Sequence, residues 1–231
     1  MLQYISIQVD APTLGHRQAR QYSLSDAPCP NFYRVSIERD AGADPSDTKA
    51  HPGLISNIMH DVMKEGDVVR VSHPMGDFFV DPKSADEKTP LVLLSAGVGL
   101  TCLTSILNTL VSRPSPQPIS WIHGARSTDA RAFAKPIKEI QRSRDNVKVV
   151  LFNANITNRD VKGVDFHHEG RIDLMALDPA AELFVSDDKS QYYVCGPPQF
   201  MTDMDDKLQA LGVDAKRIHM ELFGTGGVPR A

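Results

Sequence analysis

Cysteine, tryptophan and long apolar runs are scarce in this chain of 231 residues. The sequence holds three cysteines and one tryptophan. Cys29, Cys102 and Cys195 form neither an even set nor a CxxC pair, which argues against a disulfide framework and against a structural zinc site. Such cysteine usage is typical of a reducing compartment, so we expect a cytoplasmic protein.

Membrane-spanning segments and basic clusters are also missing. The longest nearly apolar run, Pro90 to Leu103, is shorter than the roughly 20 residues that cross a bilayer. The first residues lack the basic and apolar regions of a secretory signal. The net charge is −4 and the lysines and arginines are scattered, so we expect neither a membrane nor a nucleic acid as a partner.

The first third of the chain has the patterns of β-structure. Apolar and polar residues alternate with period two over Tyr4–Val9 and Tyr33–Glu38, which predicts two strands with one wet face each. Arg20–Leu24 is a short and unusually polar strand candidate between them. Apolar residues spaced i, i+3, i+4 and i+7 from Ile55 to Val62 predict an amphipathic helix, and a strand is expected to resume at Val69–Val71.

A charged, proline-bounded segment, Asp81–Pro90, has the composition of an exposed linker. It predicts two domains, residues 1–85 and 86–231. Beyond it, short apolar runs alternate with helical patterns, which predicts a parallel sheet covered by helices on both faces. The expected strands are 91–94, 119–122, 147–151, 192–194 and 218–222; the expected helices are 100–111, 130–143 and 198–211; and 153–170 is expected to be an irregular loop.

Two glycine turns are expected at the carboxyl ends of strands in this second domain. Ser95–Thr101 follows a buried strand and opens a helix, so its backbone N–H groups are suited to a pyrophosphate. Tight turns also need glycine for structural reasons, and the third glycine of the dinucleotide fingerprint is missing. A second turn, Tyr192–Pro198, can converge with the first on one ligand, because ligands of open α/β sheets bind at the carboxyl ends of strands.

Other candidates have a structural and a functional interpretation. Cys195 is either a small buried apolar residue or a thiol that faces a cofactor. His167, His168 and Glu169 carry metal-ligand chemistry, but no further ligands cluster nearby, so we expect exposed histidines and no metal site.

In the first domain, Arg20, Tyr22 and Ser23 place a cation, an aromatic ring and a hydroxyl group on one strand. This set can hold a flavin nucleotide, although an ordinary edge strand explains it too. Gly53–Asn57 at a helix start has donors for an anion, with Ser56 adding a hydroxyl group, or it is a plain helix cap.

The segment Arg20–Asp26 resembles the flavin domain of flavohaemoglobins, the nitric oxide dioxygenases, within the ferredoxin-reductase-like superfamily. Further matching segments are Gly53–His60, Gly66–Val69, Pro74–Phe79, Ser95–Thr101, His123–Arg126, Tyr193–Met201 and Glu221–Gly224. The resemblance covers nearly the whole chain. It implies an antiparallel flavin-binding barrel, truncated at its N-terminus, followed by an NAD(P)-binding domain with a parallel sheet.

The resemblance also implies the cofactors, FAD and NAD(P)H, and the residues around them. Those near FAD are Tyr4, Arg20, Tyr22, Ser23, Gly53, Ser56 and Asn57, with Glu221 and Phe223 over the isoalloxazine. Those near the nicotinamide nucleotide are Gly97, Gly99, Thr101, Cys195, Gly196 and Pro197. The catalytic set is Tyr22, Ser23, Cys195, Glu221 and Phe223.

The chain departs from the family pattern in three ways. Cys102 stands where the family usually has proline, and we expect neither a globin nor about two barrel strands that family members have before Tyr4, which is compatible with a standalone reductase, a truncated gene product or a fragment. We therefore expect an FAD-dependent NAD(P)H oxidoreductase that passes electrons to an external acceptor, with a haem protein in trans and nitric oxide detoxification as the leading context. A reductase recruited to secondary metabolism and a catalytically silent nucleotide-binding or interaction module are the alternatives.

The nucleotide preference rests on one segment. No acidic residue or paired arginine is clearly placed to read the 2′ position, so we expect NADH to be used at least as well as NADPH. Arg126, Ser127 and Arg131 are the candidates for a 2′-phosphate contact.

Overall fold

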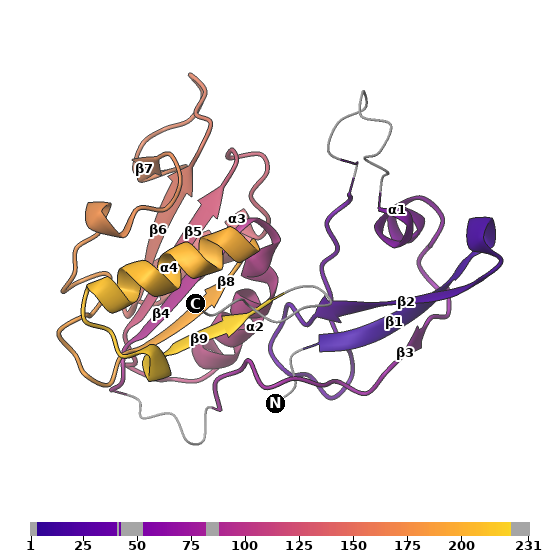
Figure 1. Cartoon of the computed structure of the whole chain (residues 1–231), viewed down its shortest axis with the longest axis horizontal. Helices are drawn as coiled ribbons and strands as arrows, with labels where there is room; N and C mark the ends of the chain where they lie inside the picture. The colour runs from indigo at the N-terminus through magenta and orange to yellow at the C-terminus, as the bar shows by residue number, and fades with distance from the viewer. Residues whose placement is uncertain (1–3, 41, 43–52, 82–87, 223–231) are drawn as a thin grey trace.

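Two sheets of opposite kinds make up the two parts of the chain (Figure 1). The computed structural model describes residues 4–40, 42, 53–81 and 88–222. The N-terminal sheet has three strands in the order β2-β1-β3, and the C-terminal sheet has six in the order β7-β6-β5-β4-β8-β9. An antiparallel sheet followed by a parallel sheet is the architecture that the sequence predicts.

The N-terminal sheet is antiparallel and buries one face. Its elements are β1 (Tyr4–Ala11), β2 (His16–Ser23), β3 (Arg70–Val71) and helix α1 (Leu54–Asp61). Ile5, Ile7 and Val9 alternate along β1 and are buried with Ile55 of α1, because successive side chains of a strand point to opposite faces. The period-two pattern and the helical pattern therefore form one small core.

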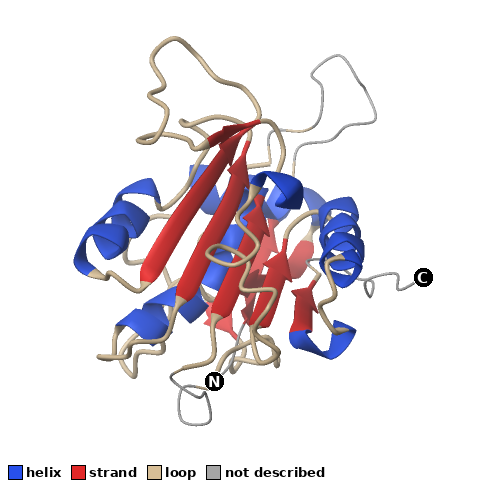
Figure 2. Cartoon of the chain, turned by 90° about the vertical axis from the view of Figure 1, so that its left-hand side faces the viewer, coloured by secondary structure: helices blue, strands red, loops and turns tan. Residues whose placement is uncertain are grey.

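The C-terminal sheet is parallel throughout and lies between layers of helix (Figure 2). Its strands are β4 (Leu91–Ala96), β5 (Ile119–Ala125), β6 (Val147–Asn153), β7 (His168–Glu169), β8 (Gln191–Cys195) and β9 (Ile218–Glu221), and its helices are α2 (Leu100–Val111), α3 (Ala134–Ser143) and α4 (Pro198–Ala210). Short 3₁₀ segments lie at Pro12–Leu14, Gly97–Gly99, Leu174–Ala176 and Ala215–Arg217.

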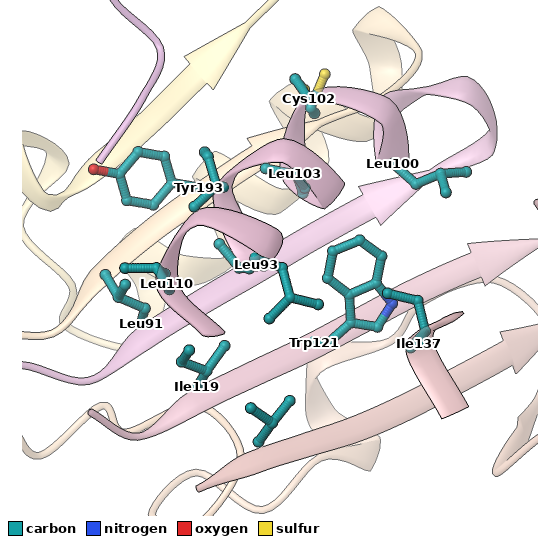
Figure 3. Packing of buried hydrophobic residues seen from close by; sticks show 14 of the residues in the cluster. Leu91, Leu93, Leu100, Cys102, Leu103, Leu110, Ile119, Trp121, Ile137 and Tyr193 are labelled. Atoms are coloured by element: carbon teal, nitrogen blue, oxygen red, sulfur yellow. The ribbon is translucent and has the colours of Figure 1, made fainter. Parts of the chain in front are cut away.

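Each face of the parallel sheet has its own hydrophobic core. Leu93 and Trp121 pack with Leu103 of α2 and Ile137 of α3 on one face (Figure 3). The other face packs against residues of α4 such as Met201. Burial on both faces explains why the strands read as continuous apolar runs rather than as alternating ones.

The predicted strand Tyr33–Glu38 is wrong, because the structure forms only an isolated bridge there, between Leu24 and Val35. The segment is held by a backbone hydrogen bond from Ser25 N to the Arg34 carbonyl oxygen, at 2.8 Å, and by side chains. His60 lies with its Nε2 2.8 Å from the carbonyl oxygen of Ile37, and the Ser25 and Ser36 hydroxyl groups are 2.9 Å apart. Alternation predicts which residues face inward, but it does not predict a hydrogen-bonded neighbour strand.

Smaller differences occur in the second part of the chain. Helix α3 begins at Ala134 rather than at 130, after Phe133 in the left-handed region with φ 54°. The loop expected over 153–170 includes β7, which pairs with β6 at Phe152 and Asn153. The predicted domain boundary between 85 and 86 lies outside the described residues. Among the described residues no helix is long and apolar enough to cross a membrane.

Shortening Leu103 is expected to destabilise the fold. Its side chain is fully buried between α2 and the sheet, so Leu103→Ala should lower the free energy of unfolding by about 2–5 kcal/mol. Val68, which is 95% exposed, provides the matched control: Val68→Ala should change it by less than about 0.5 kcal/mol. Urea denaturation measures both, and equal effects of the two substitutions would contradict this packing.

Candidate functional site

The two parts of the chain are joined through Asp26, which follows β2. Its backbone carbonyl accepts a hydrogen bond from Ser105 Oγ at 2.7 Å, and its Oδ1 accepts one from Asn108 Nδ2 at 2.8 Å. Both donors lie on α2. Asp26 also pairs with Arg34 at 3.0 Å, and the Arg34 guanidinium lies 5.5 Å from the centre of the Phe133 ring. These contacts hold the segment after β2 against the middle and the last turn of α2.

A cavity of about 580 Å³ lies between the two parts. Tyr22 and Ser23 line it from the end of β2, and Val98, Thr101 and Arg126 line it from the carboxyl ends of β4 and β5. Residues predicted to hold a flavin and a residue predicted to hold a nicotinamide nucleotide therefore share one cavity. Its volume is within the range of ordinary ligand sites.

The flavin candidates on β2 are partly or fully buried. Ser23 is buried, and burial raises the pKa of the half-buried Tyr22. Tyr22 therefore presents a neutral phenol to the cavity at physiological pH. Tyr4 lies directly opposite Ser23 in the β1–β2 pair, so the two side chains are on the same face of the sheet.

The candidates at the start of α1 meet at Asp40, which lines the cavity. Gly53 N and Asn57 Nδ2 both donate to the Asp40 carbonyl oxygen, at 3.0 and 2.9 Å. Ser56 Oγ accepts from Asp40 N at 3.4 Å and donates to the Gly53 carbonyl oxygen at 3.0 Å. A Cβ on Gly53 would lie 2.7 Å from the Cβ of Asp40. Only glycine at position 53 lets the backbone come this close to Asp40. Gly53, Ser56 and Asn57 therefore hold Asp40, which forms part of the cavity wall.

The cations at this cavity differ from the predicted one. The Arg20 guanidinium donates to Gln18 Oε1 and to the Ala19 carbonyl oxygen, at 3.2 and 2.8 Å, and it does not line the cavity. Arg39 and Arg126 line it instead. Arg39 also bonds Asp61, which lowers the pKa of that carboxyl group. Sequence reasoning missed Arg39. The residue directly follows the Tyr33–Glu38 segment, and no motif marked it as a binding residue.

The β4–α2 turn packs directly on the end of β8. Gly97 has φ 54°, with no atom within 4 Å of the place where a Cβ would be. A Cβ on Gly99 would lie 2.1 Å from the carbonyl oxygen of Cys195. Thr101 Oγ1 donates to the Val98 carbonyl oxygen at 3.1 Å. The glycines therefore leave the outer side of the turn open to a ligand and bring the two predicted nucleotide turns into contact.

Cys195 is fully buried behind this turn. Its Sγ donates to the Glu221 carbonyl oxygen at 3.3 Å, and Cys102 Sγ donates to the Gly99 carbonyl oxygen, also at 3.3 Å. Burial, and then the neighbouring Cys102 thiol, raise the pKa of Cys195 well above its usual value. Cys195 is therefore a neutral thiol at physiological pH and has no thiolate chemistry in this conformation.

Other predicted site residues lie around Cys195: Gly196 and Pro197 from the nicotinamide group, and Glu221 from the isoalloxazine group. Glu221 is its register partner on β9. Gly196 is buried, and a Cβ there would lie 2.6 Å from the Phe200 ring. Pro197 caps the start of α4. Phe223, predicted over the isoalloxazine, lies outside the described residues.

Two further predictions have structural outcomes. The expectation of exposed histidines is wrong: His167 Nδ1 accepts a hydrogen bond from Leu151 N at 3.0 Å, and His168 stacks on Phe152 at 4.6 Å, so both are partly buried. Of the candidates for a 2′-phosphate contact, Arg126 lines the cavity between the two parts and Arg131 lines a second cavity.

Comparisons with known proteins agree with this geometry. Residues 93–206 match the model of the oxidoreductase NAD-binding domain. The flavohemoprotein of Bordetella pertussis is 41% identical over 98% of this chain and 53% of its own length, and that of Rhizobium meliloti is 36% identical over 96% and 52%. The flavohem-like FAD/NAD-binding domain of nitric oxide dioxygenase from Vibrio cholerae is 33% identical, with a TM-score of 0.79 over 96% of this chain and 84% of that one. The chain belongs to the flavohemoprotein reductase family.

Membership in the family makes the chain an oxidoreductase of the flavohaemoglobin reductase type. It spans about half the length of the curated flavohemoproteins that it matches. The cytochrome b5 reductase domain of Ulva prolifera nitrate reductase has the same fold at 18% identity, with a TM-score of 0.75. The order of motifs therefore identifies the family, while the fold alone is shared more widely.

Alkylation of the native protein is expected to distinguish the three cysteines. Cys29 is partly exposed, whereas Cys102 and Cys195 are buried, and the raised pKa of Cys195 keeps its thiol protonated. Iodoacetamide at pH 8 should therefore modify Cys29 alone, as read by mass spectrometry, and all three thiols after denaturation in urea. Modification of Cys195 in the native protein as fast as that of Cys29 would contradict this site.

Proposed function

We propose that this chain is an FAD-dependent NAD(P)H oxidoreductase that passes electrons from the nicotinamide nucleotide through the flavin to an external acceptor. The observation that carries the proposal is the shared cavity, which Tyr22 and Ser23 line from one side and Thr101 from the other. A transfer between two bound nucleotides requires that their reacting rings be held in contact. A single cavity at the joint of the two sheets meets this requirement.

The residues of the N-terminal part fit FAD. Tyr22 offers an aromatic face, Ser23 a hydroxyl group and Arg39 a cation, and the Asp40 turn forms a wall held by Gly53 and Asn57. A flavohaemoglobin from Malassezia yamatoensis, 28% identical with a TM-score of 0.73, has been described with bound FAD and haem. When bound, FAD would supply the two-electron chemistry of the reaction, and the chain would position it.

The residues of the C-terminal part fit a nicotinamide nucleotide. The open side of Gly97 and the start of α2 offer backbone N–H groups to a pyrophosphate. We assign Thr101, Gly196 and Pro197 to orienting the nicotinamide end. The neutral Cys195 thiol supports this region from behind Gly99, and Glu221 lies beside it on β9. Residues 1–85 and 86–231 are the corresponding FAD and NAD(P) domains in this proposal.

We propose a haem protein in trans as the acceptor, in a nitric oxide detoxification system. The support is family membership: the Vibrio cholerae relative is a domain of a nitric oxide dioxygenase. The chain matches about half the length of a flavohemoprotein. Arg126 in the shared cavity is a cation available to the phosphates of either nucleotide.

Flavin reconstitution followed by anaerobic reduction tests the proposal. The purified chain should bind FAD, show flavin absorbance and bleach when NADH is added without oxygen. Tyr22→Ala should weaken FAD binding by about tenfold, roughly 1.4 kcal/mol, because an aromatic face in the cavity is lost. Tyr33→Ala is the matched control, since Tyr33 is 52% exposed and does not line the shared cavity.

Two results would contradict the proposal. A chain that binds no FAD, or binds FAD that NADH does not reduce, would be a silent nucleotide-binding or interaction module. Reduction that occurs while a ferric haem protein accepts no electrons would leave the oxidoreductase in place and reject the haem acceptor.

A further inference from the structure

A second cavity, of about 410 Å³, lies between α3 and the face of the sheet formed by β5 and β6. It shares no lining residue with the cavity between the two sheets. Trp121, Val149 and Leu151 form its floor, and Ile137 of α3 closes one side. Figure 3 shows Trp121 and Ile137 side by side at the edge of the core. This cavity therefore offers an apolar floor within the size range of ligand sites.

The rim of this cavity is cationic. Lys135, Lys138 and Arg142 share one face of α3 at spacings of three and four residues, and Arg131 lies just before the helix. Among the described residues, no carboxylate forms an ion pair with any of the three on α3. Three unpaired cations beside an apolar floor favour a ligand that is both anionic and apolar.

Asp165 is the acidic residue that lines this cavity, and it is engaged elsewhere. Its Oδ2 accepts a hydrogen bond from Val161 N at 2.9 Å, and its backbone carbonyl oxygen accepts one from Arg131 Nη1 at 2.6 Å. These bonds fold the 161–165 loop over the cavity. Arg131 also interacts electrostatically with Asp165 and Asp160, so the three cations of α3 carry the excess positive charge of the rim.

The start of α3 also favours an anion. No side chain caps the N-terminus of α3, and its first turn has no acidic residue, so the N–H groups of Ala134 and Lys135, which precede Pro136, remain available to an anion. His123 lies at the inner end of the cavity, 2% exposed, with its Nδ1 2.8 Å from Ser95 Oγ. Burial lowers the pKa of His123 to about 4, so the imidazole is neutral at physiological pH.

We propose that this cavity is a binding site for an amphipathic carboxylate of the medium-chain fatty acid class. The hydrocarbon chain lies in the cavity beside Val164, which is 48% exposed, above the buried Trp121 and Val149, and the carboxylate lies at the rim beside Lys135 and Lys138. A free phosphate would leave the apolar floor empty, and an uncharged hydrocarbon would leave the cations without a partner. The carboxylate gains charge-assisted hydrogen bonds from the rim while the chain leaves water.

The single tryptophan of the chain makes the test direct. Trp121 is the only tryptophan among the 231 residues, so all tryptophan emission reports on this cavity. Titration of the full chain with decanoate, below its micellar concentration, should give a saturable change in tryptophan emission. Decanol and acetate, which have only the chain or only the charge, should each bind at least about tenfold more weakly.

Variants separate this site from unspecific binding. The double substitution Lys135→Gln and Lys138→Gln should weaken decanoate binding by about tenfold, since two exposed cations of the rim are lost without change to the core. Lys216→Gln, at an exposed lysine that lines no described cavity, should leave binding unchanged. Val164→Glu, at a lining residue that is 48% exposed, should repel the carboxylate and weaken binding further.

The proposal is overturned if decanoate causes no saturable change in tryptophan emission, or if decanol binds as tightly as decanoate. Neither result requires a variant. Equal decanoate affinity in the double variant and in Lys216→Gln would overturn the placement of the carboxylate. The readout needs neither flavin nor nicotinamide nucleotide, so its failure would leave the proposed reductase function untouched.

Discussion

The docking of Asp26 on α2 is the contact on which the rest of the site depends. One residue accepts hydrogen bonds from Ser105 and Asn108 and pairs with Arg34. Each such bond contributes only about 0.5–1.5 kcal/mol net, and the Asp26–Arg34 pair is partly exposed, so the set provides orientation more than stability. Phe78 and Val80, which pack into the core of the parallel sheet, supply the apolar part of the joint. Together these contacts hold the segment after β2 against α2, and the shared cavity lies between the end of that strand and the start of the helix.

A second constraint acts inside the C-terminal sheet. Gly99 lies so close to the Cys195 carbonyl oxygen that no side chain fits between them. The two nucleotide turns are therefore one rigid unit, and Cys102 and Cys195 fill the space behind it with buried thiols.

Much of the C-terminal sheet could be predicted from sequence, because its strands are buried on both faces and read as short apolar runs. Helix α2 begins and ends where its pattern predicts, Leu100–Val111. The Tyr33–Glu38 segment could not be predicted in this way, since hydrogen bonds from His60 and Ser25 replace a neighbouring strand there. Local alternation carries no information about these distant partners.

The candidate site also has features that the sequence predicts and features that it does not. The pairing of Tyr22 and Ser23 with Thr101 follows from motif order, because each motif ends a strand that faces the joint. The choice of cation does not: Arg20 is bound to its own strand, and Arg39 and Arg126 line the cavity. The sequence also does not decide whether Cys195 is buried, since a short apolar strand followed by glycine fits both a buried thiol and one that faces a ligand.

The rate of flavin reduction in an Asp26 variant tests the central claim most directly. Asp26→Ala should keep both sheets folded and FAD bound, but slow the anaerobic reduction of the flavin by NADH at least about tenfold, because the two halves of the cavity lose their alignment. Asp10→Ala removes a carboxylate whose side chain is 78% exposed and pairs on the surface, and it should leave the rate unchanged. Stopped-flow absorbance at the flavin band measures both, and an unaltered rate in Asp26→Ala with full flavin content would contradict the account.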